Sequence, residues 1–130
     1  MRWQGQVVSG LGEASRFMSF EWVKQQIERL LGIPVYPGTI NLLCPRSGEL
    51  LRWIESEQPL VIEPPAGSNF CRGFLYPVMI GPADAYGAIL RPDVGDYPAD
   101  KIELVAGFLP VEIGDWLELR PADDATRRSS

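Results

Sequence analysis

The chain has 130 residues, of which 45% are hydrophobic and 22% are charged, and its 12 basic and 17 acidic residues give a net charge of −5. This size and composition are typical of one soluble globular domain, and the acidic balance argues against binding to nucleic acids or anionic membranes. The chain has no histidine, and its two cysteines, Cys44 and Cys71, have no metal-ligand spacing. A histidine-based catalytic triad and a Cys/His zinc site are therefore excluded.

The first elements are predicted to be a strand and a helix. Residues 3–10 alternate, then turn apolar, and end in a glycine, which indicates a strand. Ser19 is expected to cap a helix that ends at Gly32, because Pro34 prevents its continuation. The apolar positions of this helix fall on one face: Phe20, Val23, Ile27, Leu30 and Leu31.

The rest of the chain consists of short apolar runs separated by turn residues, as 13 glycines and 12 prolines suggest. Strands are predicted at residues 39–44, 60–63, 73–80, 86–91, 101–106 and 116–120, whereas 49–55 is either a helical turn or an irregular edge. We therefore expect a mainly β fold: a small closed six-stranded barrel with one α-helix inserted near the N-terminus. The barrel domain is predicted to span 1–120, with a flexible tail at 121–130.

The N-terminus has no apolar run typical of a signal peptide, and no later segment is long and apolar enough to span a bilayer. A cytoplasmic location is the expectation. The oligomeric state is left open, with a monomer possible.

The stretch SGLGEAS, residues 9–15, follows the first predicted strand. Gly10 and Gly12 can adopt positive φ and bring the backbone close to a ligand, so successive N–H groups here could bind phosphate. The stretch is neither a Walker loop, since no GK[ST] follows, nor a dinucleotide fingerprint. An ordinary connection between a strand and a helix remains the alternative.

The segment YPGTIN, residues 36–41, combines a Pro-Gly turn with two polar side chains. Thr39 and Asn41 are two residues apart, so in an extended segment they share a face. A hydroxyl and a carboxamide oxygen are ligands that suit Mg²⁺ when a substrate's phosphates supply negative charge. The alternative is a turn whose Thr and Asn bind backbone groups.

Glu103 is predicted on a strand face opposite Ile102 and Leu104. From the pattern alone, such a residue is expected at the solvated surface.

Four segments, GQVVSGLGEA, PGTIN, GAILRP and KIELVA, in this order and spacing, resemble the CTP-dependent riboflavin kinase family, best known from archaea. The resemblance extends from Gly5 to about Leu119. It implies a cradle-loop β-barrel that transfers the γ-phosphate of CTP to the 5′-hydroxyl of riboflavin, giving FMN and CDP with Mg²⁺. It offers no obvious side-chain base, and phosphoryl transfer depends mainly on alignment and charge neutralisation.

The resemblance also implies site residues. Thr39 and Asn41 would hold Mg²⁺, Glu103 and Gly95 would lie at the flavin, and one stretch would bind the nucleotide: Gly10, Leu11, Gly12, Glu13, Ala14, Ser15 and Arg16.

The chain departs from the family pattern at several places. Ala14 and Ser15 stand where the family has a glycine and a basic residue, and Arg16 is one position late. Gly95 replaces a threonine. The segment after Ala106 is several residues short and lacks a basic residue. Arg16, Lys24, Arg72 and Lys101 all remain candidates for the missing positive charge.

Two other functions remain open. One is a flavin- or nucleotide-binding barrel that no longer transfers phosphate or has changed its donor. The other is a structural or regulatory protein without a small-molecule site, although the net charge disfavours a DNA-binding role.

Overall fold

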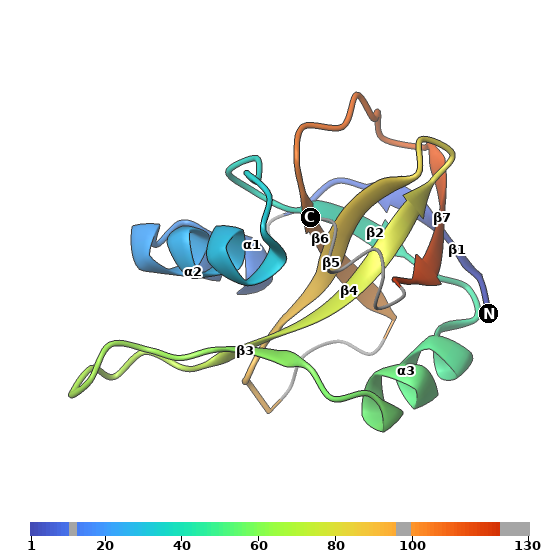
Figure 1. Ribbon diagram of the computed structural model, residues 1–130. Helices are drawn as coiled ribbons and strands as arrows, with labels where there is room; N and C mark the ends of the chain where they lie inside the picture. The colour runs from blue at the N-terminus through green and yellow to red at the C-terminus, as the bar shows by residue number, and fades with distance from the viewer. Residues whose placement is uncertain (11–12, 96–99, 123–130) are drawn as a thin grey trace.

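The architecture is a closed antiparallel β-barrel (Figure 1). A computed structural model describes residues 1–10, 13–95 and 100–122. Its strands are β1 (Trp3–Val8), β2 (Ile40–Leu43), β3 (Leu60–Ile62), β4 (Gly73–Gly81), β5 (Ala85–Pro92), β6 (Lys101–Ala106) and β7 (Trp116–Pro121). The sheet order is β3-β4-β5-β6-β2-β1-β7, and β4 also pairs with β7. Six strands therefore close into a ring, and β3 adds to the edge of β4, which confirms the predicted fold class.

Strand β4 closes the barrel by pairing with two different neighbours along one edge. Gly73–Leu75 pairs with β3, and Val78–Gly81 pairs with β7, while the other edge pairs with β5 throughout. Pro77, which has no N–H to donate, lies at the changeover between these two pairings. The length of β4 thus allows one strand to belong both to the ring and to the added β3 hairpin.

Buried side chains form two clusters because both faces of several strands are covered. The inner cluster fills the barrel and includes Ile102 and Leu104 of β6. The outer cluster includes Val105, from the opposite face of the same strand. Alternation along a strand sends neighbouring side chains to opposite faces, so β6 contributes to both clusters.

The described residues contain three helices: α1 (Glu13–Met18), α2 (Glu21–Leu31) and α3 (Ser47–Ser56). Helices α1 and α2 lie together against one outer face of the barrel, and α3 lies at one end of it (Figure 1). Leu50, Trp53 and Ile54 of α3 join the inner cluster, where Trp53 contacts Trp3 with ring centroids 5.1 Å apart. Thus α3 contributes apolar side chains to the barrel interior.

The sequence predicts one helix, whereas the described residues form three helices, and the N-terminus of α2 also differs from the prediction. Helix α2 ends as predicted, since Gly32 is left-handed at φ 74° and its N–H donates to the Glu28 carbonyl at 2.9 Å. Its N-cap is Phe20 and not Ser19. The Ser19 hydroxyl instead donates to the Arg16 carbonyl at 2.6 Å, because α1 ends immediately before it. The undecided segment at 49–55 lies within the regular helix α3.

The segment predicted to be a tail falls mostly outside the described residues. Its first two residues are described: Pro121 ends β7, and Ala122 is buried, with its N–H donating to the Pro77 carbonyl at 3.1 Å. Within the described ranges, no helix has the length and apolar character needed to cross a bilayer.

Candidate functional site

A cavity of about 370 Å³ opens at one end of the barrel, where the α2–β2 and β6–β7 connections meet. It is lined by Gly10, Ser15, residues 36–41, Leu104, residues 106–109 and Val111. The structure therefore brings Gly10 and Ser15 of the glycine stretch to Thr39 and Asn41 of the YPGTIN segment. Such a volume is within the usual range of small-molecule sites.

Strand pairing explains why these segments meet. Asn41 of β2 lies between Val8 of β1 and Glu103 of β6 in the antiparallel ladder. Residues opposite each other in a ladder are close neighbours. Gly10 follows β1 and has a φ of +142°, a backbone conformation that favours glycine.

Glu103 is fully buried, with 0% of its surface exposed, so the expectation of a solvated side chain is wrong. Its Oε2 accepts a hydrogen bond from the Ala14 N–H at 3.0 Å. Its Oε1 accepts from the Ser15 N–H and from the Thr39 hydroxyl, both at 3.2 Å. These three donors compensate the cost of burying the carboxylate. Through these hydrogen bonds, the Glu103 carboxylate connects the first turn of α1 to β6 and to Thr39.

This arrangement changes the interpretation of the glycine stretch. Ala14, Ser15 and Arg16 belong to α1 and not to an extended loop. The N–H groups of Ala14 and Ser15 already donate to Glu103. Contact of this stretch with a nucleotide stays a prediction. Leu11, Gly12 and the side chain of Glu13, which were also predicted to bind it, lie outside the described residues.

Asn41 is only 7% exposed, and of its two side-chain amide groups only the NH₂ has a hydrogen-bond partner among the described residues. Its Nδ2 donates to the Gly10 carbonyl at 2.6 Å, which fixes the orientation of the side chain. Its Oδ1 is buried and has no hydrogen-bond partner among the described residues. A buried acceptor without a partner is costly unless a ligand satisfies it.

The residues at this position fit a divalent cation such as Mg²⁺. Asn41 Oδ1 is an unsatisfied hard oxygen, and the Thr39 hydroxyl donates its proton to Glu103, so its lone pairs remain for a cation. Within the described ranges, no group of three or more Cys, Asp or Glu side chains could hold a metal ion. A cation bound here would therefore depend on negative charge brought by a ligand.

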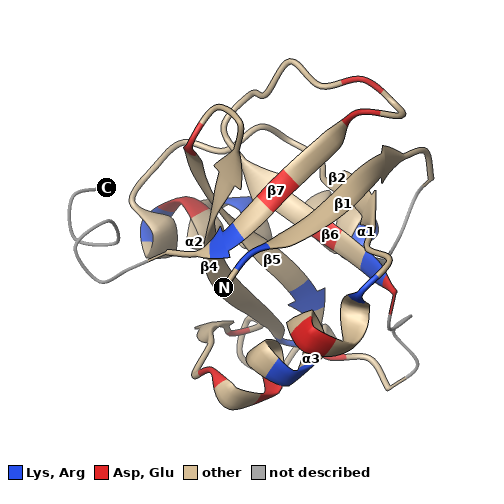
Figure 2. Ribbon diagram, turned by 90° about the vertical axis from the view of Figure 1, so that its right-hand side faces the viewer, with Lys and Arg blue, Asp and Glu red and all other residues tan. Residues whose placement is uncertain are grey.

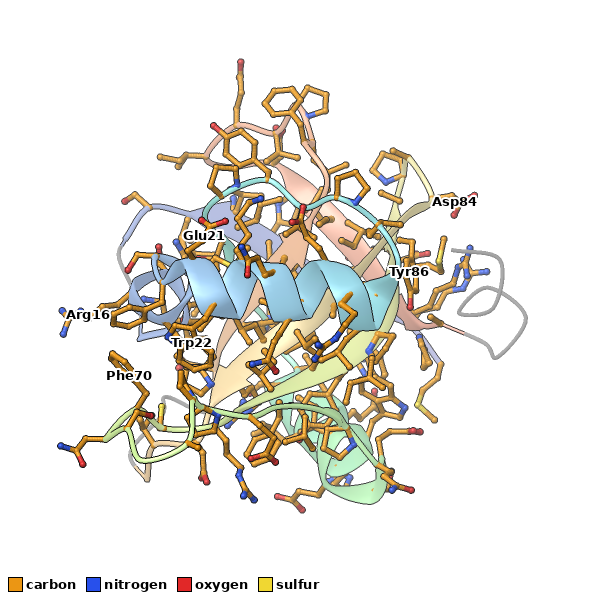
Figure 3. All side chains as sticks on the ribbon, turned by 60° about the vertical axis from the view of Figure 1, so that its left-hand side comes forward. Arg16, Glu21, Trp22, Phe70, Asp84 and Tyr86 are labelled. Atoms are coloured by element: carbon orange, nitrogen blue, oxygen red, sulfur yellow. The ribbon has the colours of Figure 1, made fainter. Side chains whose placement is uncertain are left out.

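The four basic residues considered for the missing positive charge lie in different environments. A Cβ added to Gly10 would lie 3.7 Å from Nζ of Lys101, which places this ammonium beside the glycine. Lys24 pairs with Glu28 at 3.3 Å, and Arg72 pairs with Glu63 at 3.5 Å. Arg16 is exposed and points outward from α1 (Figure 3). Of the three candidates outside the predicted nucleotide-binding stretch, Lys101 is thus the one whose ammonium lies beside it.

Gly95 lies in the connection between β5 and β6 and is exposed. A Cβ added there would meet no described heavy atom within 4 Å. The structure does not place Gly95 among the described residues that line the cavity. Its predicted contact with a flavin stays a prediction.

Two aromatic side chains border the cavity, Tyr36 from the α2–β2 connection and Phe108 from the β6–β7 connection. Their ring centroids are 5.5 Å apart with an interplanar angle of 58°. From the sequence, five aromatic residues are possible stacking partners of a flavin, and burial in the core is the ordinary expectation for each of them: Tyr36, Phe74, Tyr86, Tyr97 and Phe108. Burial is wrong for this pair, since Tyr36 is 53% exposed and Phe108 is 70% exposed.

The other aromatic candidates have different surroundings. Phe74 packs against the inner cluster and Tyr86 against the outer cluster, as the expectation of core packing requires. Tyr97 lies outside the described residues. Exposure therefore separates Tyr36 and Phe108 from Phe74 and Tyr86, and the sequence pattern contained no signal for this difference.

Comparison with known proteins finds a matching family model and curated relatives of the chain. A family model named for CTP-dependent riboflavin kinases, with the description "Domain of unknown function DUF120", matches residues 7–126. Among curated proteins, riboflavin kinases from Pyrobaculum islandicum and Pyrobaculum calidifontis are both 37% identical, over 95% and 92% of this chain and 57% and 55% of their own length.

A riboflavin kinase from Methanosarcina barkeri is 32% identical over 92% of this chain and 52% of its own length. The chain thus spans about half the length of these curated relatives.

Proposed function

Because the chain belongs to the CTP-dependent riboflavin kinase family, we propose that it transfers the γ-phosphate of CTP to riboflavin with the aid of Mg²⁺. The products are FMN and CDP. The riboflavin 5′-oxygen forms the new bond to phosphorus, the bond from phosphorus to the bridging oxygen of CDP breaks, and the hydroxyl proton leaves to solvent. The unsatisfied Oδ1 of Asn41, a residue that lines the same cavity as Thr39, is the observation that carries this proposal.

The residues of the chain would act by positioning. Thr39 Oγ1 and Asn41 Oδ1 would hold the cation, whose charge offsets that of the transferred phosphate. Glu103 holds the Thr39 hydroxyl in place, and the Gly10 carbonyl holds the Asn41 amide. The Lys101 ammonium beside Gly10 would add positive charge near the phosphates.

None of the described residues that line the cavity is Asp, Glu or Lys. That the reaction proceeds without a side-chain base stays a prediction. Alignment of the two substrates and neutralisation of charge are sufficient sources of rate enhancement for this reaction. Glu103 was predicted to contact the flavin; because its carboxylate is buried against α1 and Thr39, such a contact would require those groups to move.

The proposal is tested with Asn41→Ala, using Asn69→Ala as the matched control because Asn69 is exposed in the β3–β4 connection. Asn41→Ala removes one oxygen ligand, so we expect the Mg²⁺ requirement for FMN formation to rise at least about tenfold. The lost bond to Gly10 should cost only about 1 kcal/mol of stability, so the variant stays folded. An unchanged Mg²⁺ dependence in Asn41→Ala would overturn the metal assignment.

One observation favours a second function, a flavin- or nucleotide-binding barrel without transferase activity. The β6–β7 connection, residues 107–115, carries Glu112 and Asp115 and neither Lys nor Arg (Figure 2). A connection of this composition cannot supply a cation to a triphosphate. Stoichiometric riboflavin binding without FMN formation from any nucleotide would favour this function.

A further inference from the structure

The exposed pair Tyr36 and Phe108 lies in an unusual place for two large aromatic side chains. Aromatic residues normally bury most of their surface, and an isolated exposed ring needs no explanation. These two are in contact with each other at the border of the same cavity that contains Thr39 and Asn41. Their exposure therefore adds an apolar surface to a candidate site that also contains polar groups.

The backbone holds the two rings near each other without a ligand. The Tyr36 N–H donates to the Ala106 carbonyl at 2.8 Å, two residues before Phe108. A Cβ added to Gly107 would lie 3.6 Å from the Pro34 carbonyl oxygen, so the two connections pass close together there as well. Rings held by such contacts lose less conformational entropy when a ligand binds.

The geometry of the pair leaves ring faces available. At an interplanar angle of 58° the rings do not cover each other's faces. Their exposed fractions, given above, confirm that much of each ring is open. A third planar ring can therefore stack on one of them in the offset arrangement that aromatic systems prefer.

We propose that Tyr36 and Phe108 form a stacking platform for the planar heteroaromatic ring of a bound substrate. This inference rests on the proposed function, which supplies two such rings, the isoalloxazine of riboflavin and the base of the nucleotide. The reactive phosphate would lie at Thr39 and Asn41, and the platform would hold the ring that is linked to it by a sugar or ribityl chain. Stacking recognises the face of a ring and not its hydrogen-bonding edge, so it tolerates different bases.

The test compares Phe108→Leu, which keeps an apolar side chain but removes the ring, with Phe108→Tyr, which keeps the ring. Phe70→Leu is the control, because Phe70 is also exposed and does not line the cavity among the described residues. Riboflavin is titrated by its fluorescence without nucleotide, and CTP is titrated by calorimetry with Mg²⁺ and without riboflavin. For one of these two ligands we expect Phe108→Leu to weaken binding about tenfold, with Phe108→Tyr and Phe70→Leu within about twofold of the parent protein.

The two titrations identify the source of the ring. Loss confined to riboflavin assigns the platform to the isoalloxazine, and loss confined to CTP assigns it to the base. If the parent protein binds both ligands and Phe108→Leu binds them equally well, the platform is refuted while the proposed function stands. If the parent protein binds neither ligand, the proposed function fails and the platform fails with it.

Discussion

The substitution Glu103→Gln tests whether the buried carboxylate fastens α1 and Thr39 to the barrel. Glutamine has the same shape, but it replaces one acceptor oxygen with an NH₂ donor. In either orientation of the amide, this donor faces at least one of the backbone N–H groups of Ala14 and Ser15, which now donate to the carboxylate. The variant therefore loses charge-assisted hydrogen bonds and leaves a buried donor without an acceptor.

We estimate the loss from the structure. A hydrogen bond to a charged group contributes about 1.5–3 kcal/mol, and an unsatisfied buried donor costs about 1–3 kcal/mol. Because the amide keeps one acceptor oxygen, we expect Glu103→Gln to lower the free energy of unfolding by about 2–3 kcal/mol. In a domain of this size that corresponds to a fall in Tm of roughly 6–15 °C.

The assay is urea unfolding followed by tryptophan fluorescence, with Glu118→Gln as the matched control. Glu118 makes an ion pair with Arg2 at 3.1 Å on the surface, and such pairs contribute about 0–1 kcal/mol. Amide hydrogen exchange at Ala14 and Ser15 should accelerate in Glu103→Gln only. If Glu103→Gln and Glu118→Gln lose the same small amount of stability, the carboxylate does not hold α1.

Two further predictions concern the barrel itself. Gly87→Ala should lower the free energy of unfolding by more than about 2 kcal/mol, because the new Cβ would lie 2.5 Å from the Val105 carbonyl oxygen. Gly48→Ala in α3 should raise the free energy of unfolding by about 0.5–1 kcal/mol, because its Cβ would meet nothing within 4 Å. Urea unfolding of both variants measures the two changes. Burial raises the pKa of the Cys44 thiol to about 11 from its ordinary 9.0. Between these two pH values the unfolded chain loses a proton that the folded chain keeps, so the free energy of unfolding should fall as pH rises. Iodoacetamide at pH 8 should accordingly modify the partly exposed Cys71 well before Cys44, and equal rates in the native protein would contradict this burial.

Much of the barrel could be predicted from local patterns. Strand β6 is an example, since Ile102 and Leu104 alternate with Glu103 as in a half-buried strand. The two-residue spacing of Thr39 and Asn41 also predicted that they share a face, because alternation in an extended segment does not depend on the rest of the fold, and both residues line one cavity.

The remaining features depend on tertiary contacts. Glu103 is buried because α1 covers its side of β6, and the sequence around Glu103 contains no sign of that cover. Helix α1 has only six residues, too few to produce a helical repeat. Helix α3 does have a signal in the sequence, since Leu50, Trp53 and Ile54 have helical spacing.

The most direct test of the account is to incubate the purified chain with riboflavin and Mg²⁺ and to supply CTP, ATP, GTP and UTP in separate reactions. FMN is then measured by chromatography. The account predicts FMN in the reaction that contains CTP, formed by a barrel in which Thr39 and Asn41 hold the cation. No FMN with any nucleotide, from protein that still binds riboflavin, would contradict it and leave a flavin-binding barrel without transferase activity.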